Sequence, residues 1–231
     1  MSKVLLDGDI VAYRSAYSTE DMEPEDCEHK VDELIDDVMG FTLFEFDHDM
    51  VEVFLTGPTN FRYELATIAP YKGNRKDSVK PRHLSHARDY LIEEYGAVVS
   101  VDEEADDMIA KRATELGRGT VIASVDKDFL QVPVTFFNMG RREFTEVSEF
   151  DAHYNFYTQV LTGDRADNIK GLANIGPKKA ERALEGATTE EELYARVYDM
   201  YDGDMDALLE NARLLWLRRK EDQLWLPPDQ R

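Results

Sequence analysis

Residues 3–9 read Lys-Val-Leu-Leu-Asp-Gly-Asp, a short apolar run that ends in two acids. Val4, Leu5 and Leu6 are typical of a strand buried on both faces of a parallel sheet. Residues 10–17 have the pattern of a following helix. Because ligands of such sheets bind where the strands end, this stretch predicts an α/β fold with acidic residues at its functional edge.

The alternation of strands and helices continues for about 150 residues. After the first strand, we predict strands at 50–55, 97–101, 120–124 and 134–138, with 143–147 as a hairpin partner of the last, and helices at 31–44, 84–95 and 104–116. Residues 21–28 are acidic and predict a loop. From residue 151 the pattern is mostly helical, at 157–162, 178–184, 190–201 and 205–220. We therefore predict a mainly parallel sheet flanked by helices in 1–150 and a helical lobe in 151–231.

The charge of the chain is unevenly distributed. The 231 residues carry a formal net charge of −21, which taken alone argues against a nucleic-acid partner. Residues 72–88, however, include six basic residues and only one acidic residue, Asp77. The longer segment 61–90 has few large apolar residues and is interrupted by Pro70 and Pro81, so it predicts an exposed or mobile insertion. This uneven distribution of charge indicates a basic segment that binds phosphates and acidic clusters that bind cations.

The sequence also bears on location. No run of eighteen apolar residues is present, so we expect no transmembrane helix and no membrane partner. The first apolar run ends at Asp7 and is too short for a signal peptide, which predicts a cytoplasmic protein. Cys27 is the single cysteine and cannot form an internal disulfide.

Four acidic clusters fall at predicted strand ends, helix starts and turns. The candidate metal ligands within them are Asp7, Asp9, Glu104, Asp106, Asp107, Asp126, Asp128, Asp164 and Asp167. Asp126 and Asp128 would point the same way in strand geometry, and Asp164 and Asp167 would share a face if their turn is helical. Each cluster alone also fits a solvated turn, and the acids at 103–107 also fit a helix N-terminal cap.

The composition of these clusters predicts the metal. Carboxylates without histidine favour Mg²⁺ or Mn²⁺ over zinc. Two such ions about 4 Å apart are a common arrangement for phosphodiester hydrolysis.

Two further motifs predict contacts with DNA. Gly171 to Ala180 places a glycine turn before a helix that bears Lys178 and Lys179, which offers N–H groups and a positive dipole end to phosphate, although an ordinary connection between helices is the alternative. In Tyr71-Lys72-Gly73-Asn74-Arg75-Lys76, the tyrosine suits base stacking and the cations suit a scissile phosphate, although a solvated basic loop is the alternative.

In their order along the chain, these motifs resemble those of the 5′-nuclease superfamily, which includes flap endonucleases and 5′-3′ exonucleases. The resemblance covers about residues 3–185 and is greatest for phage exonucleases of the T7 type. It implies a PIN-like nuclease domain in 1–150, a helical arch in 61–90, and a helix-two-turn-helix lobe in 151–231, with a potassium ion as a further candidate ligand.

The resemblance also implies residue roles. The nine acids named above resemble ligands of two Mg²⁺ or Mn²⁺ ions. Lys72 and Arg75 resemble catalytic cations. The implied DNA-binding residues are Tyr71, Lys76, Gly171, Ile175, Gly176, Lys178 and Lys179. The implied activity is cleavage of DNA at 5′ ends, flaps, nicks and gaps by a monomer, in the host cytoplasm if a phage encodes it, with RNA–DNA hybrids as further candidate substrates.

One departure concerns the end of the second strand. The superfamily usually has an aspartate there, whereas this chain has Thr56. We expect Asp9 to compensate as an extra ligand.

Two alternative functions fit part of the sequence. The Asp7-Gly8-Asp9 motif also resembles the first motif of haloacid-dehalogenase-type phosphatases, with Asp7 as nucleophile, and Gly163-Asp164 resembles their last motif. That alternative leaves the acids at 104–107 and 126–128 and the turn at Ile175 unexplained. A non-catalytic, structure-specific DNA-binding module would explain Thr56 but not the retained carboxylates.

Overall fold

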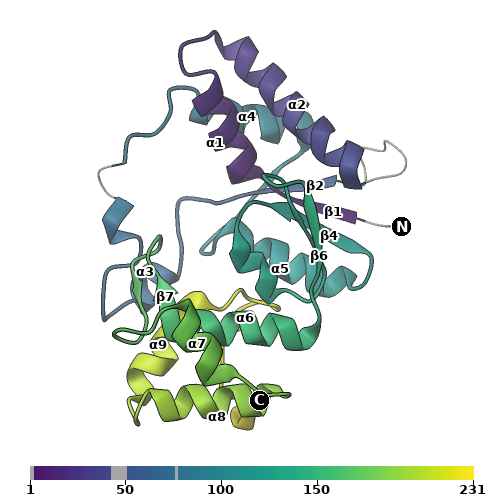
Figure 1. The fold of residues 1–231 in the computed structure, drawn as a ribbon. Helices are drawn as coiled ribbons and strands as arrows, with labels where there is room; N and C mark the ends of the chain where they lie inside the picture. The colour runs from purple at the N-terminus through teal and green to yellow at the C-terminus, as the bar shows by residue number, and fades with distance from the viewer. Residues whose placement is uncertain (1–2, 43–50, 76–77) are drawn as a thin grey trace. The chain divides into compact units, whose positions relative to one another are not determined.

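The computed structural model describes residues 3–42, 51–75 and 78–231, which form two compact units (Figure 1). Unit 1 contains Met1–Asn60, Val79–Phe129 and Val134–Glu146, and unit 2 contains Phe61–Ser78, Leu130–Pro133 and Val147–Arg231. The predicted insertion at 61–90 is thus divided, with 61–78 in unit 2 and the remainder in unit 1. No helix in the described part of the chain is long and apolar enough to span a membrane.

Unit 1 is built on a six-stranded sheet. Its strands are β1 (Lys3–Asp7), β2 (Val51–Leu55), β3 (Val98–Val99), β4 (Thr120–Ser124), β5 (Thr135–Asn138) and β6 (Glu143–Glu146). The order is β3-β2-β1-β4-β5-β6, and all neighbouring pairs are parallel except β5–β6. The mainly parallel sheet and the terminal hairpin confirm the predictions.

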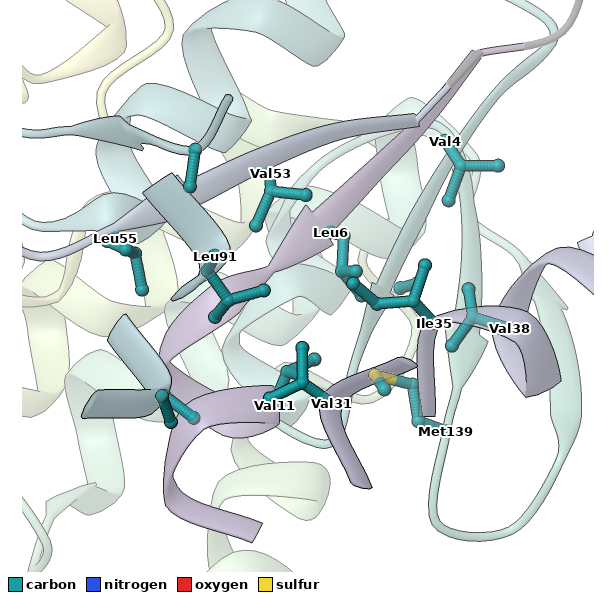
Figure 2. Close-up of a cluster of buried hydrophobic side chains, with 14 of the residues drawn as sticks. Val4, Leu6, Val11, Val31, Ile35, Val38, Val53, Leu55, Leu91 and Met139 are labelled. Atoms are coloured by element: carbon teal, nitrogen blue, oxygen red, sulfur yellow. The ribbon is translucent and has the colours of Figure 1, made fainter. Parts of the chain in front are cut away.

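Helices cover both faces of this sheet. They are α1 (Gly8–Ser18), α2 (Pro24–Thr42), α4 (Leu84–Tyr95) and α5 (Ala105–Leu116). Val4 and Leu6 of β1 join Val11, Ile35 and Leu91 of α1, α2 and α4 in one apolar cluster (Figure 2). Because side chains alternate along a strand, the buried Leu5 points to the other face, on which α5 packs against β1, β2 and β4.

Unit 2 is mainly helical. Its helices are α3 (Arg62–Leu65), α6 (Glu149–Thr162), α7 (Pro177–Leu184), α8 (Glu190–Met200) and α9 (Met205–Leu215). A short antiparallel hairpin joins β7 (Gly163–Asp164) to β8 (Ile169–Lys170). Three 3₁₀ turns complete the described elements: η2 (Gly73–Arg75), η3 (Lys127–Gln131), which extends from unit 1 into unit 2, and η4 (Pro228–Gln230).

The core of unit 2 is rich in aromatic side chains. Helix α6 packs against α7, α8 and α9. Phe156 and Tyr157 of α6 meet Trp225, and Phe156 also meets Trp216 edge to face with ring centroids 5.0 Å apart. The tryptophans therefore belong to the core, as packing of such large rings favours.

Some predicted boundaries were wrong. The acidic stretch at 21–28 is not a loop, because α2 begins at Pro24, where a proline in the first turn and following acids favour a helix start. The helix predicted at 157–162 begins at Glu149, with Ser148 as its cap. The helix predicted at 205–220 ends at Leu215. The limits predicted at residues 44 and 50 lie outside the described residues.

Two side chains of the predicted exposed insertion, Arg62 and Tyr71, are buried, whereas most of the described residues around them are exposed or half-buried. Arg62 is 1% exposed, and its guanidinium donates to the carbonyls of Leu214 at 2.8 Å and Trp216 at 2.9 Å. Tyr71 is 4% exposed and belongs to the core of unit 2. The two carbonyls that accept hydrogen bonds from the buried Arg62 hold this part of the chain within unit 2.

Candidate functional site

The carboxyl ends of three adjacent parallel strands place acidic motifs at one edge of the sheet in unit 1. Strands β2, β1 and β4 are neighbours and end at Leu55, Asp7 and Ser124. Thr56 and Asp126 follow the outer two. This arrangement confirms the expectation that the first and third acidic motifs share an edge with Thr56.

Asp7 is the most buried of these strand-end acids. It is 4% exposed, and it accepts hydrogen bonds from the Ser124 hydroxyl at 2.6 Å and the Ile10 amide at 3.2 Å. Burial raises the pKa of Asp7 to about 7, with the negative charges of Asp9 and Asp126 acting in the same direction, while the two hydrogen bonds oppose the shift. A buried carboxylate beside other acids is stabilised by a nearby cation.

Ser124 links the first and third acidic motifs. Its hydroxyl donates to Asp7 and accepts from the Asp126 amide at 3.0 Å. Asp126 in turn accepts from the Asp128 amide at 2.9 Å. A role for Ser124 could not be predicted from the sequence, because a serine at a strand end carries no metal-ligand signal of its own.

The acids at the start of α5 form a helix cap. Glu104 is the N-cap, its side chain accepts from the Asp107 amide, and the Asp107 side chain accepts from the Glu104 amide. Both residues are buried, and Asp107 is fully so. The capping alternative therefore describes these two carboxylates, while Asp106 lies half-buried in the first turn.

Thr56 and Asp9 are joined by an arginine that the sequence analysis did not assign to the site. Arg88 of α4 donates through Nη1 to Asp9 and through Nη2 to the Thr56 carbonyl at 2.7 Å. The other Asp9 oxygen accepts from the Thr56 amide at 2.9 Å, and the Thr56 hydroxyl accepts from the Ala105 amide at 3.0 Å. Both oxygens of Asp9 thus have donors, which makes it a counterion, and its expected role as a compensating ligand stays a prediction.

The acidic side chains of unit 1 offer few grouped donors for a hard cation. Within residues 3–42, 51–75 and 78–231, no group of three or more His, Cys, Asp or Glu side chains lies close enough to hold a metal. Asp7 and Asp126 nevertheless supply the oxygen donors that Mg²⁺ prefers, and the pKa of Asp7 is raised first by its burial and further by the negative charges of Asp9 and Asp126. These two side chains fit a hard cation best among the predicted ligands.

The fourth acidic motif lies in unit 2, and its turn is not helical as the pairing of Asp164 with Asp167 required. Residues 163–164 and 169–170 pair as antiparallel strands, so the two acids do not share a helix face. Asp164 accepts from the Ala166 amide at 2.7 Å, which closes the turn.

Asp167 contacts three predicted nuclease residues. Its carboxylate accepts from the Tyr71 hydroxyl at 2.7 Å and from Arg75 Nη2 at 2.7 Å, and Lys72 Nζ lies 3.8 Å away. In this arrangement the Tyr71 ring is packed in the core of unit 2 and meets Tyr63 edge to face. Stacking of Tyr71 on a base stays a prediction and would require the ring to leave this position. Lys76 lies outside the described residues.

The glycine turn leads into α7 as the sequence predicts. Gly176 is the N-cap of α7 and Pro177 its first residue, and both Lys178 and Lys179 are exposed. Lys179 Nζ donates to the Asn174 carbonyl at 2.8 Å. A Cβ built on Gly176 would meet nothing within 4 Å, so the turn leaves open space at the helix start.

Gly171 has a packing role. A Cβ there would lie 2.2 Å from the Thr162 carbonyl carbon and 2.3 Å from the Gly163 amide nitrogen. Because Gly171 has no side chain, the two ends of the hairpin can approach each other. The predicted DNA contacts of Gly171 and of the half-buried Ile175 stay predictions.

No family model matches the chain. DNA polymerase I of Bacillus caldotenax is 27% identical over 94% of this chain and 27% of its own length. Flap endonuclease Xni of Shewanella piezotolerans is 32% identical over 52% of each protein. This chain therefore spans about a quarter to a half of the curated relatives that it matches.

Solved structures with the same fold come from bacteriophage T5. A flap endonuclease pseudo-enzyme–product complex with DNA and metal ions has a TM-score of 0.71 and 16% identity, covering 93% of this chain and 89% of that one. A second T5 structure, co-crystallised with metal ions, has a TM-score of 0.69 and 17% identity with the same coverage. At this identity the likeness confirms the predicted PIN-like fold alone.

Proposed function

This chain belongs to the 5′-nuclease superfamily, and on that premise we propose that it is a metal-dependent nuclease that hydrolyses DNA phosphodiester bonds at 5′ ends and branch points. The observation that carries the proposal is the buried Asp7, joined through Ser124 to Asp126 where two parallel strands end. The flap endonuclease relatives give this edge its substrate class.

The proposed cofactor is Mg²⁺ or Mn²⁺, bound as two ions. Asp7 and Asp126 would hold metal, with Asp128, Glu104, Asp106, Asp107 and Asp164 as further candidate ligands. When bound, the metal would supply an activated water and charge stabilisation of the leaving oxygen. Ser124 fixes the rotamer of Asp7 by its hydrogen bond, and the cap at Glu104 and Asp107 fixes the start of α5.

The proposed substrate contacts come from basic groups of unit 2. Lys72 and Arg75 would neutralise the scissile phosphate, and donors aimed at developing charge lower a barrier more than donors in water do. The open N-terminus of α7, with Lys178 and Lys179, would hold the duplex backbone without reading bases. We also propose that the enzyme acts as a cytoplasmic monomer, with RNA–DNA hybrids as a second substrate and K⁺ at the turn before α7.

The experiment is cleavage of a 5′-labelled flap and a 5′-labelled blunt duplex in Mg²⁺ and in EDTA. Wild type is compared with Asp126→Asn/Asp128→Asn and with a matched control, Asp199→Asn/Asp202→Asn, whose acids are exposed in unit 2. We expect Mg²⁺-dependent product from wild type and control, and loss of product with retained DNA binding in the acidic-motif variant.

The other outcomes identify the alternatives. Binding without cleavage by any protein would support a non-catalytic DNA-binding module. Hydrolysis of small phosphate esters that is abolished by Asp7→Asn but survives Asp126→Asn/Asp128→Asn would support the phosphatase.

A further inference from the structure

Residues 70–75 are hydrogen-bonded to residues 165–168, the turn between β7 and β8 in unit 2, and we call this turn the seat of the basic motif. Four hydrogen bonds join the two segments: Lys72 N to Asp167 O at 2.9 Å, Asn74 Nδ2 to Arg165 O at 2.8 Å, Arg75 Nε to Ala166 O at 2.9 Å, and Asn168 Nδ2 to Pro70 O at 2.9 Å. The contacts run along the whole length of both segments. The seat therefore fixes the position of the basic motif within unit 2.

The backbone of the basic motif and of its seat is held in an uncommon conformation. Lys72 has a φ of 51° and Asn168 a φ of 61°, in the left-handed region. Asparagine tolerates this region, whereas lysine adopts it at a cost of about 1 kcal/mol. Such a residue persists where its surroundings hold it, and here the Lys72 amide is bonded to the facing turn.

The Asp167 carboxylate is the charged centre of the seat. Its side chain is 17% exposed. Oδ2 accepts from the Tyr71 hydroxyl and lies 3.8 Å from Lys72 Nζ, while Oδ1 accepts from Arg75. An anion held by two cations and a hydroxyl stabilises the cations where they are.

The same contacts disagree with a metal-ligand role for Asp167. Each oxygen already has a donor, and a divalent cation would have to approach beside Lys72 and Arg75, which repel it. A DNA phosphate is negatively charged, so Lys72 and Arg75 attract it. It competes with the carboxylate for these same two side chains, because it offers several acceptor oxygens.

We infer that Asp167 is a positioning residue that holds Lys72 and Arg75 as their counterion until a DNA phosphate takes them over. This inference rests on the proposed function, in which these two cations meet the scissile phosphate. In the DNA-free protein Asp167 keeps the motif on its seat. When DNA binds, the phosphate replaces the carboxylate as the partner of both cations.

The test uses Asp167→Asn, which keeps an acceptor for Tyr71 but removes the charge. Amide hydrogen exchange of residues 71–75 should become about tenfold faster in the DNA-free variant, because the ion pairs that oppose local opening are lost. Mn²⁺ affinity, measured by calorimetry without DNA, should stay within about twofold of wild type. Asp167→Glu, which keeps the charge, should restore most of the exchange protection.

Two reference variants calibrate these readouts. Arg75→Gln should raise exchange over 71–75 to a similar degree, and the double variant Asp167→Asn/Arg75→Gln should add little, because both single changes break one interaction. Asp7→Asn should weaken Mn²⁺ binding without changing exchange over 71–75.

DNA binding completes the test. Loss of the competing carboxylate should tighten binding of a flap substrate in Ca²⁺ by about threefold or more, while kcat in Mg²⁺ falls, since the cations are less well placed. A drop of about tenfold in Mn²⁺ affinity for Asp167→Asn, with unchanged exchange, would overturn the inference and make Asp167 a ligand. Weaker DNA binding would also overturn it. Exchange and Mn²⁺ binding need no cleavage, so failure of the nuclease proposal would be seen separately, as wild type without product.

Discussion

Arg88 and Asp9 form an ion pair at the end of β2, and the same guanidinium binds the carbonyl of Thr56. At this position the resemblance to the 5′-nuclease superfamily leads one to expect an aspartate, and the chain has Thr56, which is bonded to Arg88 and Asp9. The Thr56 hydroxyl also accepts a hydrogen bond from the amide of Ala105, the first residue of α5. The substitution at Thr56 therefore leaves the strand end well bonded.

Replacing Arg88 should destabilise unit 1. Arg88→Met keeps most of the aliphatic length but leaves Asp9 and the Thr56 carbonyl without this donor. We expect the free energy of unfolding to fall by about 1–3 kcal/mol, because both lost hydrogen bonds involve a charged group and are partly shielded from water. Urea denaturation measures the change. Arg82→Met, at an exposed position outside this network, should cost less than about 0.5 kcal/mol, and equal losses in both variants would contradict the argument.

The hairpin of unit 2 should be intolerant of a single methyl group. In Gly171→Ala the new Cβ would lie within 2.6 Å of three backbone atoms, so the strands must separate. We expect a loss of about 3 kcal/mol or more, seen as a lower melting temperature in calorimetry.

Gly176→Ala is the matched control in the same turn, since nothing lies within 4 Å of its Cβ and its φ is −108°. It should melt close to wild type. If it melts as early as Gly171→Ala, the cause is general sensitivity of this turn to substitution.

The regular parts of the fold could be predicted because their signals are local. Helix 84–95 and strand 120–124 have the predicted bounds, since an amphipathic pattern and a short apolar run specify them without help from distant residues. The burial of Arg62 and Tyr71 could not be predicted. It depends on Arg62 meeting carbonyls about 150 positions later and on Tyr71 bonding to Asp167, and a basic sequence gives no sign of such partners.

The candidate site shows the same division. That Asp7 and Asp126 share an edge follows from the parallel sheet, so their proximity was predictable. The roles of Ser124 and Arg88 were not, because a hydroxyl at a strand end and an arginine in a helix fit many environments. Asp164 and Asp167 would have shared a face if their turn were helical, whereas strand pairing between 163–164 and 169–170 gives them different partners.

Asp7 should make the stability of the metal-free protein depend on pH. Its ordinary pKa is 3.8, and burial raises it to about 7 in the folded chain. Between these values the folded chain holds a proton that the unfolded chain has released. The stabilising contribution is therefore complete below about pH 4 and is lost as pH rises through about 7.

Asp7→Asn removes this titration. From pH 5 to pH 8 the wild type should lose on the order of 1–4 kcal/mol relative to the variant in urea denaturation without divalent ions. Added Mg²⁺ at pH 8 should stabilise wild type more than Asp7→Asn, because a bound cation favours the ionised carboxylate. Parallel pH dependences of the two proteins would mean that Asp7 is ionised at pH 5.

Lys72 should matter for the chemical step more than for DNA binding. In Lys72→Ala the Asp167 carboxylate keeps Tyr71 and Arg75, so the seat on the β7–β8 turn survives. What is lost is one positive charge at the scissile phosphate, which typically costs about 2.7–4 kcal/mol of transition-state stabilisation, or roughly 10²- to 10³-fold in kcat. Single-turnover cleavage of a flap in Mg²⁺ measures the rate, and fluorescence anisotropy in Ca²⁺ measures binding, which should weaken only a few-fold because other phosphate contacts remain. Lys170→Ala is the control, since its Nζ bonds to Asn168 at 2.7 Å in the same turn, and it should leave the rate nearly unchanged. A Lys72→Ala enzyme that turns over at close to the wild-type rate would remove Lys72 from the reaction and leave Arg75 as the cation that faces the phosphate.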